Sequence, residues 1–237
     1  VWSGSGSGTA VISAFGGTNS TIYSTTTSLG AITGRATRIT ETVISAVPTL
    51  AVSSTDSTGW YYDAGVGVMT QITDGQFPGN NGKTLAGTFA HMDGYAFIMD
   101  TEGNIWNSDL NSITAWTAVG VIPASSYPDK GVGIVRQGDK IMVFGGDSIQ
   151  FFQNGNNPSG SPLTRIESMT QRIGCVSSDA IEQVGDIVYW VGSSTKGGIG
   201  VYAYGGGAPK RISTPEIDAA LVLAGPANIS ITATTFY

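Results

Sequence analysis

Few residues of this 237-residue sequence could perform acid–base, nucleophilic or metal chemistry. There is one histidine, His91, and one cysteine, Cys175. A Ser-His-Asp hydrolase would have to use His91 as its base, yet no G-x-S-x-G pattern accompanies it. A zinc site takes its ligands chiefly from histidine and cysteine, and the chain has too few of either. We therefore predict a packed or solvent-facing His91, a small buried Cys175, no metal ion and no cofactor.

Carboxylate pairs are the remaining route to catalysis, because a glycosidase needs two carboxyl groups that converge. Two segments, 54–60 and 102–106, faintly resemble the S-x-D-x-G-x-x-W turn of sialidase-like propellers. The first has an extra residue between Asp56 and Gly59, and the second has Thr101 at the Asp position. That turn is structural in its own families. We therefore predict that the protein is not an enzyme, and a propeller hydrolase is the weakest alternative.

The charge of the chain is low and acidic. Charged residues make up 12% of the sequence, and the formal net charge is -6. A protein that grips DNA phosphates needs clustered lysine and arginine, whereas the 11 basic residues here are scattered. We expect no specific nucleic-acid binding, although an acidic wall would let DNA slide past. We also expect no membrane span, because no apolar run reaches the ~18 residues that one requires.

A repeat dominates the sequence. Its 34 glycines suit short strands joined by tight turns. One pattern recurs: an apolar strand, a turn, and a second apolar strand that ends in an aromatic residue. The clearest copy has strands at 95–99 and 105–106, and further copies start at Ile141 and Ile187. The aromatic residues that end the second strands lie about 45 positions apart and are Tyr23, Tyr61, Trp106, Phe151 and Tyr202.

This repeat predicts a single all-β, β-propeller-like domain over residues 1–237. Three or four strands per unit are close to one propeller blade, and such units should pack radially around a channel. We expect five recognisable units and a ring completed by residues outside this chain. A β-sandwich with coincidental spacing is the alternative. The units lie at about 9–34, 43–74, 84–121, 131–166 and 180–214, and residues 215–237 are predicted to start a further unit.

An ordered series of short motifs occupies the stretch from Ile105 to Leu221. It includes N-S-D-L-N at 107–111, Y-P-D at 127–129, G-D-K-I-M-V-F-G at 138–145 and R-I-S-T at 211–214. In order and spacing, the series resembles the packaged-DNA stabilisation proteins of short-tailed bacteriophages, which form the tail hub or nozzle. Gln150 departs from the family, which usually has an acidic residue there, and Leu163 stands where an aromatic residue is expected. We interpret the motif positions as structural; they are Trp106, Asp109, Trp116, Pro128, Asp129, Gly138, Phe144, Gly145, Ile149, Gly155, Pro162, Arg165, Gly174, Trp190, Ile212, Ser213 and Thr214.

The resemblance implies a structural virion protein. Copies would form a ring, expected to be a hexamer, below the portal and adaptor proteins in the virion tail, after assembly in the host cytoplasm. The ring would extend the DNA channel, retain packaged DNA that passes without specific binding, and anchor tail fibres or spikes. A carbohydrate-binding, lectin-like propeller is the alternative, because Trp60 and Trp106 could stack on sugars. Blade packing is the simpler explanation of both tryptophans.

Overall fold

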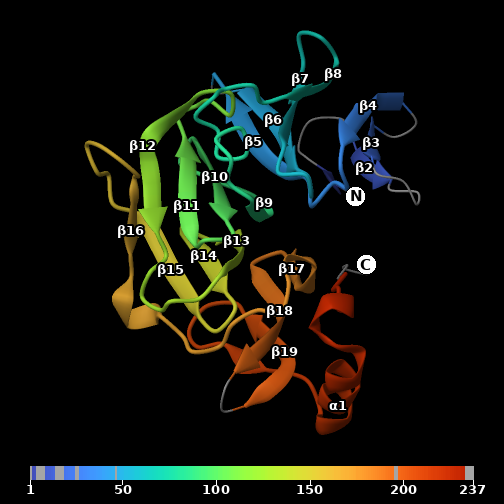
Figure 1. Ribbon diagram of the computed structural model, residues 1–237, viewed down its shortest axis with the longest axis vertical. Helices are drawn as coiled ribbons and strands as arrows, with labels where there is room; N and C mark the ends of the chain where they lie inside the picture. The colour runs from blue at the N-terminus through green and yellow to red at the C-terminus, as the bar shows by residue number, and fades with distance from the viewer. Residues whose placement is uncertain are drawn as a thin grey trace.

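Five antiparallel sheets surround a common centre (Figure 1). The computed structural model describes residues 2–3, 9–13, 19–24, 27–45, 47–194 and 197–232. Each sheet of this described part consists of four consecutive strands. The fold is an all-β propeller, as the repeat predicted. We name the sheets blade 1 to blade 5 in chain order, and each overlaps one predicted unit.

The strands of the five blades have the following bounds. Blade 1 comprises β1 (Trp2–Ser3), β2 (Thr9–Ser13), β3 (Asn19–Ser24) and β4 (Thr27–Thr33). Blade 2 comprises β5 (Thr40–Ile44), β6 (Val47–Ser53), β7 (Gly59–Asp63) and β8 (Val68–Gln71). Blade 3 comprises β9 (Leu85–Met92), β10 (Tyr95–Asp100), β11 (Asn104–Ser108) and β12 (Trp116–Pro123). Blade 4 comprises β13 (Gly131–Gln137), β14 (Lys140–Gly145), β15 (Ile149–Asn154) and β16 (Leu163–Arg165). After the 3-10 turns η1 (Glu167–Met169) and η2 (Ser178–Ala180), blade 5 comprises β17 (Ile181–Val184), β18 (Ile187–Ser194), β19 (Gly198–Tyr204) and β20 (Lys210–Arg211).

The first hairpin of blades 3, 4 and 5 turns on residues with positive φ. In blade 3, Asp93 and Gly94 have φ of 52° and 82°, and the strand register leaves a two-residue loop. Two positive angles are typical of the type I′ turn, whose twist matches that of the flanking strands. Gly138 in blade 4 and Gly185 in blade 5 have φ of 62° and 58° at the first loop position. The recurrent glycines of the sequence are therefore required by the hairpin turns.

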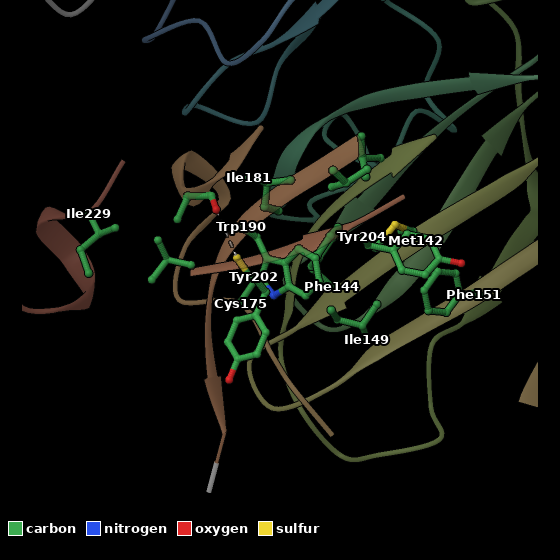
Figure 2. Packing of buried hydrophobic residues seen from close by; sticks show 14 residues of the cluster. Met142, Phe144, Ile149, Phe151, Cys175, Ile181, Trp190, Tyr202, Tyr204 and Ile229 are labelled. Carbon is green, nitrogen blue, oxygen red and sulfur yellow. Dashed lines mark hydrogen bonds between the residues drawn. The ribbon is translucent and has the colours of Figure 1, made fainter. Parts of the chain in front are cut away.

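Apolar layers between neighbouring blades form the core. Between blades 4 and 5, Trp190 stacks on Tyr202 at 5.6 Å between ring centroids and meets Phe144 edge-on at 5.7 Å (Figure 2). Phe151 and Tyr204 lie 5.1 Å apart in the same cluster. Strands β10 and β14 bury nearly every side chain, because each of these sheets lies between two others. A fully buried large apolar side chain contributes about 1.5–3 kcal/mol to stability.

The chain after blade 5 is helical, where the sequence predicted the start of a further unit. Helix α1 (Pro215–Ala224) follows Thr214. Pro215 suits the first helical turn because its φ is fixed and it needs no hydrogen-bond acceptor there. Glu216 places negative charge at the helix N-terminus, where the helix dipole favours it. Gly225, with φ of 77°, ends the helix. These residues favour a helix over a strand at this position.

A 3-10 turn, η3 (Pro226–Asn228), follows α1. Residues 229–232 adopt no strand, and residues 233–237 of the predicted further unit lie outside the described residues. None of the helices in the described part of the chain has the length and apolar character that a membrane span requires.

Candidate functional site at the propeller axis

The strands β9, β13 and β17 surround the centre of the propeller in Figure 1. Strand β9 contacts both β5 and β13. The closest approach joins Gly87 of β9 to Gly133 of β13: a Cβ atom on Gly87 would lie 3.1 Å from the Cα atom of Gly133. Gly87 also has φ of 75°, which side chains disfavour. Glycine therefore lets blades 3 and 4 meet at the axis without a side chain between them.

Two polar cavities lie beside these strands. The first has a volume of about 360 Å³, and its lining includes Arg35, Arg38 and Asp179. The second has a volume of about 590 Å³, and its lining includes Arg38, His91 and Glu182. The two cavities adjoin at Arg38, which lines both.

Arg38 reaches from the segment before β5 to blade 5. Its Nη2 atom donates to the carbonyl oxygen of Ile181 and lies 3.4 Å from a carboxylate oxygen of Glu182. Burial lowers the pKa of the Arg38 guanidinium, whereas the charges of Glu182 and Asp179 raise it. Arg35 Nη2 donates to Asp179 at 2.8 Å, and these two side chains are 51% and 43% exposed. The exposed pair contributes little by itself, so Arg38 is the stronger of the two contacts.

Threonine hydroxyl groups satisfy backbone carbonyls at the axis. Thr88 Oγ1 donates to the carbonyl oxygen of Arg38 at 2.7 Å. Thr40 Oγ1 donates to the carbonyl oxygen of Phe89, also at 2.7 Å. An innermost strand has a neighbouring strand on one side only, so its other carbonyls need a different donor. These hydrogen bonds tie blades 2 and 3 together at the centre.

Burial shifts the pKa of both candidate chemical groups, His91 and Cys175. His91 is half-buried on β9, and burial together with the charge of Arg136 lowers its pKa, so the imidazole is neutral at neutral pH. Cys175 is buried, and its thiol donates to the carbonyl oxygen of Ser177 at 3.2 Å. Burial raises the pKa of Cys175 to about 12, which keeps the thiol protonated. Among the described residues, no group of three or more His, Cys, Asp or Glu side chains could hold a metal ion.

A buried carboxylate that the sequence motifs did not predict, Asp100, organises the β10–β11 turn. Asp100 is fully buried and accepts hydrogen bonds from the backbone N–H groups of Glu102 and Asn104, each at 2.9 Å. Trp106 Nε1 donates to the same carboxylate at 2.9 Å. Trp106 is 8% exposed, so it packs in the blade and does not present a face for a sugar. The sequence already contained an aspartate close to the expected place: Asp100 lies one position before Thr101, which occupies the Asp position of the turn pattern.

Asp56 has the corresponding role after β6. Its carboxylate accepts hydrogen bonds from Thr58 Oγ1 at 2.7 Å and from the hydroxyl of Ser54. Burial raises the pKa of Asp56, but hydrogen bonds from Ser54, Thr33 and Thr58 outweigh it and lower this pKa to about 2. Trp60 Nε1 donates to Thr58 Oγ1 at 2.8 Å. Both segments that resemble the sialidase turn are therefore turns fastened by a carboxylate and a tryptophan.

The motif residue Asp129 connects the segment between blades 3 and 4 to the next turn. Its Oδ2 atom accepts hydrogen bonds from the backbone N–H of Asp147 at 2.9 Å and from Ser148 Oγ at 3.1 Å. A Cβ atom on Gly145 would lie 2.3 Å from this carboxylate. Glycine at position 145 is thus required by the close approach of Asp129, which follows Pro128 in the connection.

Further motif glycines also lie at close approaches. A Cβ atom on Gly174 would lie 1.9 Å from the carbonyl oxygen of Gly146, which belongs to the β14–β15 turn. A Cβ atom on Gly155 would lie 2.1 Å from Thr164 Oγ1. Gly138 instead has open space around it and is explained by its positive φ.

Two larger motif residues join loops to blades. Trp116 meets Phe77 edge-on at 5.1 Å between ring centroids, which anchors the long connection between blades 2 and 3. Arg165 lies over the Phe152 ring at 5.5 Å and donates through Nη2 to the carbonyl oxygen of Pro123 at 2.8 Å, which links blade 4 to blade 3. Of the other motif positions, the buried ones are Phe144, Ile149, Pro162 and Trp190, and Asp109 is exposed.

The last motif leads into α1. Ser213 Oγ accepts a hydrogen bond from the backbone N–H of Val201 at 3.0 Å and donates to Asp218 at 2.5 Å. Thr214 is the residue before the helix, and its carbonyl oxygen accepts from the backbone N–H of Asp218 at 3.0 Å. Ile212 is 53% exposed. The structure thus distributes the motif positions over blade boundaries and turns, and does not gather them into one cavity.

Comparisons with solved structures agree with the propeller fold. The chain superimposes with a TM-score of 0.53 on the dihydro-heme d1 dehydrogenase NirN, at 13% identity, covering 86% of this chain and 43% of that one. It superimposes with a TM-score of 0.53 on the β-propeller domain of Cps50 (Swd1) from Myceliophteria thermophila, at 11% identity, covering 85% of this chain and 68% of that one. At these identities the likeness concerns the fold alone. No curated protein matches the chain.

The sequence itself matches a protein family over most of its length. The matching model is described as Phage_stabilise, "Bacteriophage P22 Gp10, beta-propeller", and covers residues 17–233. This agrees with the motif series and with the five-bladed arrangement of the described residues. The protein is therefore a virion-associated structural protein of a bacteriophage, and it belongs to the phage stabilisation family of β-propellers.

Proposed function

We propose that this protein is a subunit of a tail hub, or nozzle. Copies associate into a ring, expected to be a hexamer, below the portal and adaptor proteins of the virion. The ring extends the DNA channel, retains the packaged DNA and anchors tail fibres or spikes, and it assembles in the host cytoplasm before it becomes part of the tail. The family match over residues 17–233 is the observation that carries the proposal.

The packing at the propeller axis supports a channel between copies rather than within one copy. The cavities at the axis have volumes of about 360 and 590 Å³ and adjoin at Arg38. Gly87 and Gly133 bring two blades into contact beside them. Cavities of these volumes are too small to hold a DNA duplex, whose major groove alone is about 12 Å wide. One propeller can therefore form part of a channel wall, and several copies are needed to surround the DNA.

Acidic turns suit such a wall. The first hairpins of blades 3, 4 and 5 turn at Asp93, Asp139 and Asp186, and all three residues are exposed. Because each turn follows the first strand of its blade, the three lie at the same end of the propeller. Asp139 is paired with Lys140, so Asp93, Asp186 and the net charge of -6 supply the repulsion of phosphates that favours sliding of DNA over sticking.

The assembly state of the purified protein, alone and with the adaptor ring, tests this function. Mass photometry should show a discrete ring with a fixed number of copies, formed either spontaneously or on the adaptor. A protein that stays monomeric in the presence of the adaptor ring would contradict the proposal. A glycan array serves as the contrast, because specific glycan binding would instead favour the lectin-like alternative.

A further inference from the structure

Each described blade is built without strand exchange. Each of the five sheets contains four consecutive strands, so within the described ranges no strand of blade 1 completes blade 5. Contacts other than strand pairing must therefore hold these sheets relative to one another. In the described part of the chain, the only ion pairs between the segment that leads into blade 2 and the start of blade 5 are Arg35–Asp179 and Arg38–Glu182.

We define the axial clamp as Arg35 and Arg38 on one side and Asp179, Ile181 and Glu182 on the other. The two arginines lie about 144 residues from their partners in sequence. They join the segment between β4 and β5 to η2 and β17, so blades 3 and 4 lie between the two sides in sequence. The axial clamp therefore connects two parts of the chain that the packing of consecutive blades does not connect directly.

The blade 2 side of the clamp is held by backbone hydrogen bonds. Arg35 donates from its backbone N–H to Thr55 Oγ1 at 3.0 Å, and its carbonyl oxygen accepts from the backbone N–H of Thr55 at 3.0 Å. The backbone N–H of Thr37 donates to the carbonyl oxygen of Ser53 at 2.9 Å. Both arginines thus extend from a segment that is fastened to β6 and to the turn after it.

The blade 5 side is held as firmly. Asp179 belongs to η2, and its carbonyl oxygen accepts a hydrogen bond from the backbone N–H of Ile231 at 2.9 Å. Ser177 Oγ donates to the carbonyl oxygen of Ile229 at 3.2 Å. The segment after α1 is therefore hydrogen-bonded to η2 and to the residue before it, and Arg35 forms an ion pair with η2 from the axial cavity.

We propose that the axial clamp sets the separation of blades 2 and 5 and that ionic strength controls its hold. Charged pairs in contact with solvent weaken as salt screens them, whereas the apolar layers between neighbouring blades do not. At low ionic strength the clamp keeps the arc of blades closed around the axis. At high ionic strength blade 5 separates from blade 2 while each blade stays folded. This inference concerns the chain itself and does not depend on the proposed tail function.

Spin-label distances in the whole chain test the clamp. Val66, 69% exposed at the end of blade 2, and Ala208, exposed in blade 5, are replaced by cysteine and labelled. Cys175 is buried with a raised pKa and stays unlabelled. The parent should give one narrow distance distribution at low salt. In R35A/R38A the distribution should broaden and shift to longer distances, and raising the salt concentration should change the parent in the same direction.

A matched control and a second variant keep the test decisive. Lys83→Ala removes the Lys83–Glu102 ion pair, neither residue of which lines an axial cavity, and should leave the distribution unchanged. If R35A/R38A does not fold, the swap of Arg35→Asp with Asp179→Arg replaces it, and this swap should restore the distribution that Arg35→Asp alone disturbs. Distances that stay unchanged in the arginine variant and at high salt would overturn the proposal. So would an equal change in Lys83→Ala.

Discussion

Blade 5 is held on two sides by opposite kinds of contact. On the side of blade 4, Trp190 is fully buried and packs against Phe144 and Tyr202 (Figure 2). On the side of the axis, Arg35 is half exposed and Arg38 shares a cavity wall with its carboxylate partner. The first contact depends on apolar area and steric fit, and the second depends on charge. Changes in salt and pH should therefore affect the charged contact more than the apolar one, and substitutions can remove each contact independently.

The largest effect should come from the apolar side. Trp190→Ala removes a fully buried ring whose indole N–H has no hydrogen-bond partner, so the loss is one of packing. We expect a decrease in the free energy of unfolding of about 3–5 kcal/mol. Urea unfolding followed by circular dichroism measures it, and the decrease should be independent of salt. A decrease below about 1 kcal/mol would mean that the apolar layer between blades 4 and 5 contributes little to the free energy of unfolding.

A smaller effect should come from steric crowding where the connection between blades 3 and 4 meets the end of β14. In Gly145→Ala the new methyl group would meet the carboxylate of Asp129. We expect a loss of about 1–3 kcal/mol, typical of overpacking. Gly146→Ala is the matched control, because a Cβ atom on Gly146 meets nothing within 4 Å. Thermal unfolding of both variants should show the loss in the first only. Equal melting temperatures would show that Asp129 moves aside at no cost.

At the axis, Arg38→Met keeps the aliphatic length and removes the charge. We expect a loss of about 1–2 kcal/mol, less than a fully buried pair because the Arg38 side chain is 33% exposed. Unlike the loss in Trp190→Ala, this loss should shrink as salt is added, since salt already weakens the parent pair. A difference between parent and variant that is the same at every salt concentration would contradict an electrostatic role for Arg38.

The smallest effect should appear at the exposed turn of Asp56. Its pKa is about 2 in the folded protein, below the value of about 3.9 for an unfolded aspartate. The carboxylate therefore stabilises the fold above about pH 4, and this contribution is lost as the pH falls toward about 2. The stability difference between the parent and Asp56→Asn should be present at pH 7 and shrink across this window. A difference that does not vary between pH 7 and pH 2 would show that the hydrogen bonds to Asp56 are not charge-dependent.

Features that depend on neighbouring residues could be predicted from the sequence, whereas contacts between distant residues could not. The blade hairpins were predictable, because turn glycines such as Gly94 and Gly138 and the apolar strands between them are local signals. The helix at 215–224 was missed although its signals, Thr214 followed by Pro215 and Glu216, are also local. Its apolar residues were instead assigned to the repeat.

The axis could not have been predicted. The innermost strand β5 has the sequence T-E-T-V-I. It lacks the run of apolar residues found in the hairpins farther from the axis, so that run could not be used to predict it. Arg35 and Asp179 are 144 positions apart, and the chain has other arginines and carboxylates that could have paired. Asp100 was one position away from the expected turn pattern, and only its four hydrogen-bond contacts show its role.

We propose that several copies of the propeller surround the DNA channel and that the DNA does not pass through the axis of any single propeller. An electron cryo-microscopy reconstruction of the phage tail tests it most directly. We predict a closed ring of copies below the portal and adaptor, with the DNA density on the symmetry axis of the ring and protein density filling the axis of each propeller around Arg38. DNA density along the axis of an individual propeller, or a tail in which these copies form no ring, would contradict the account.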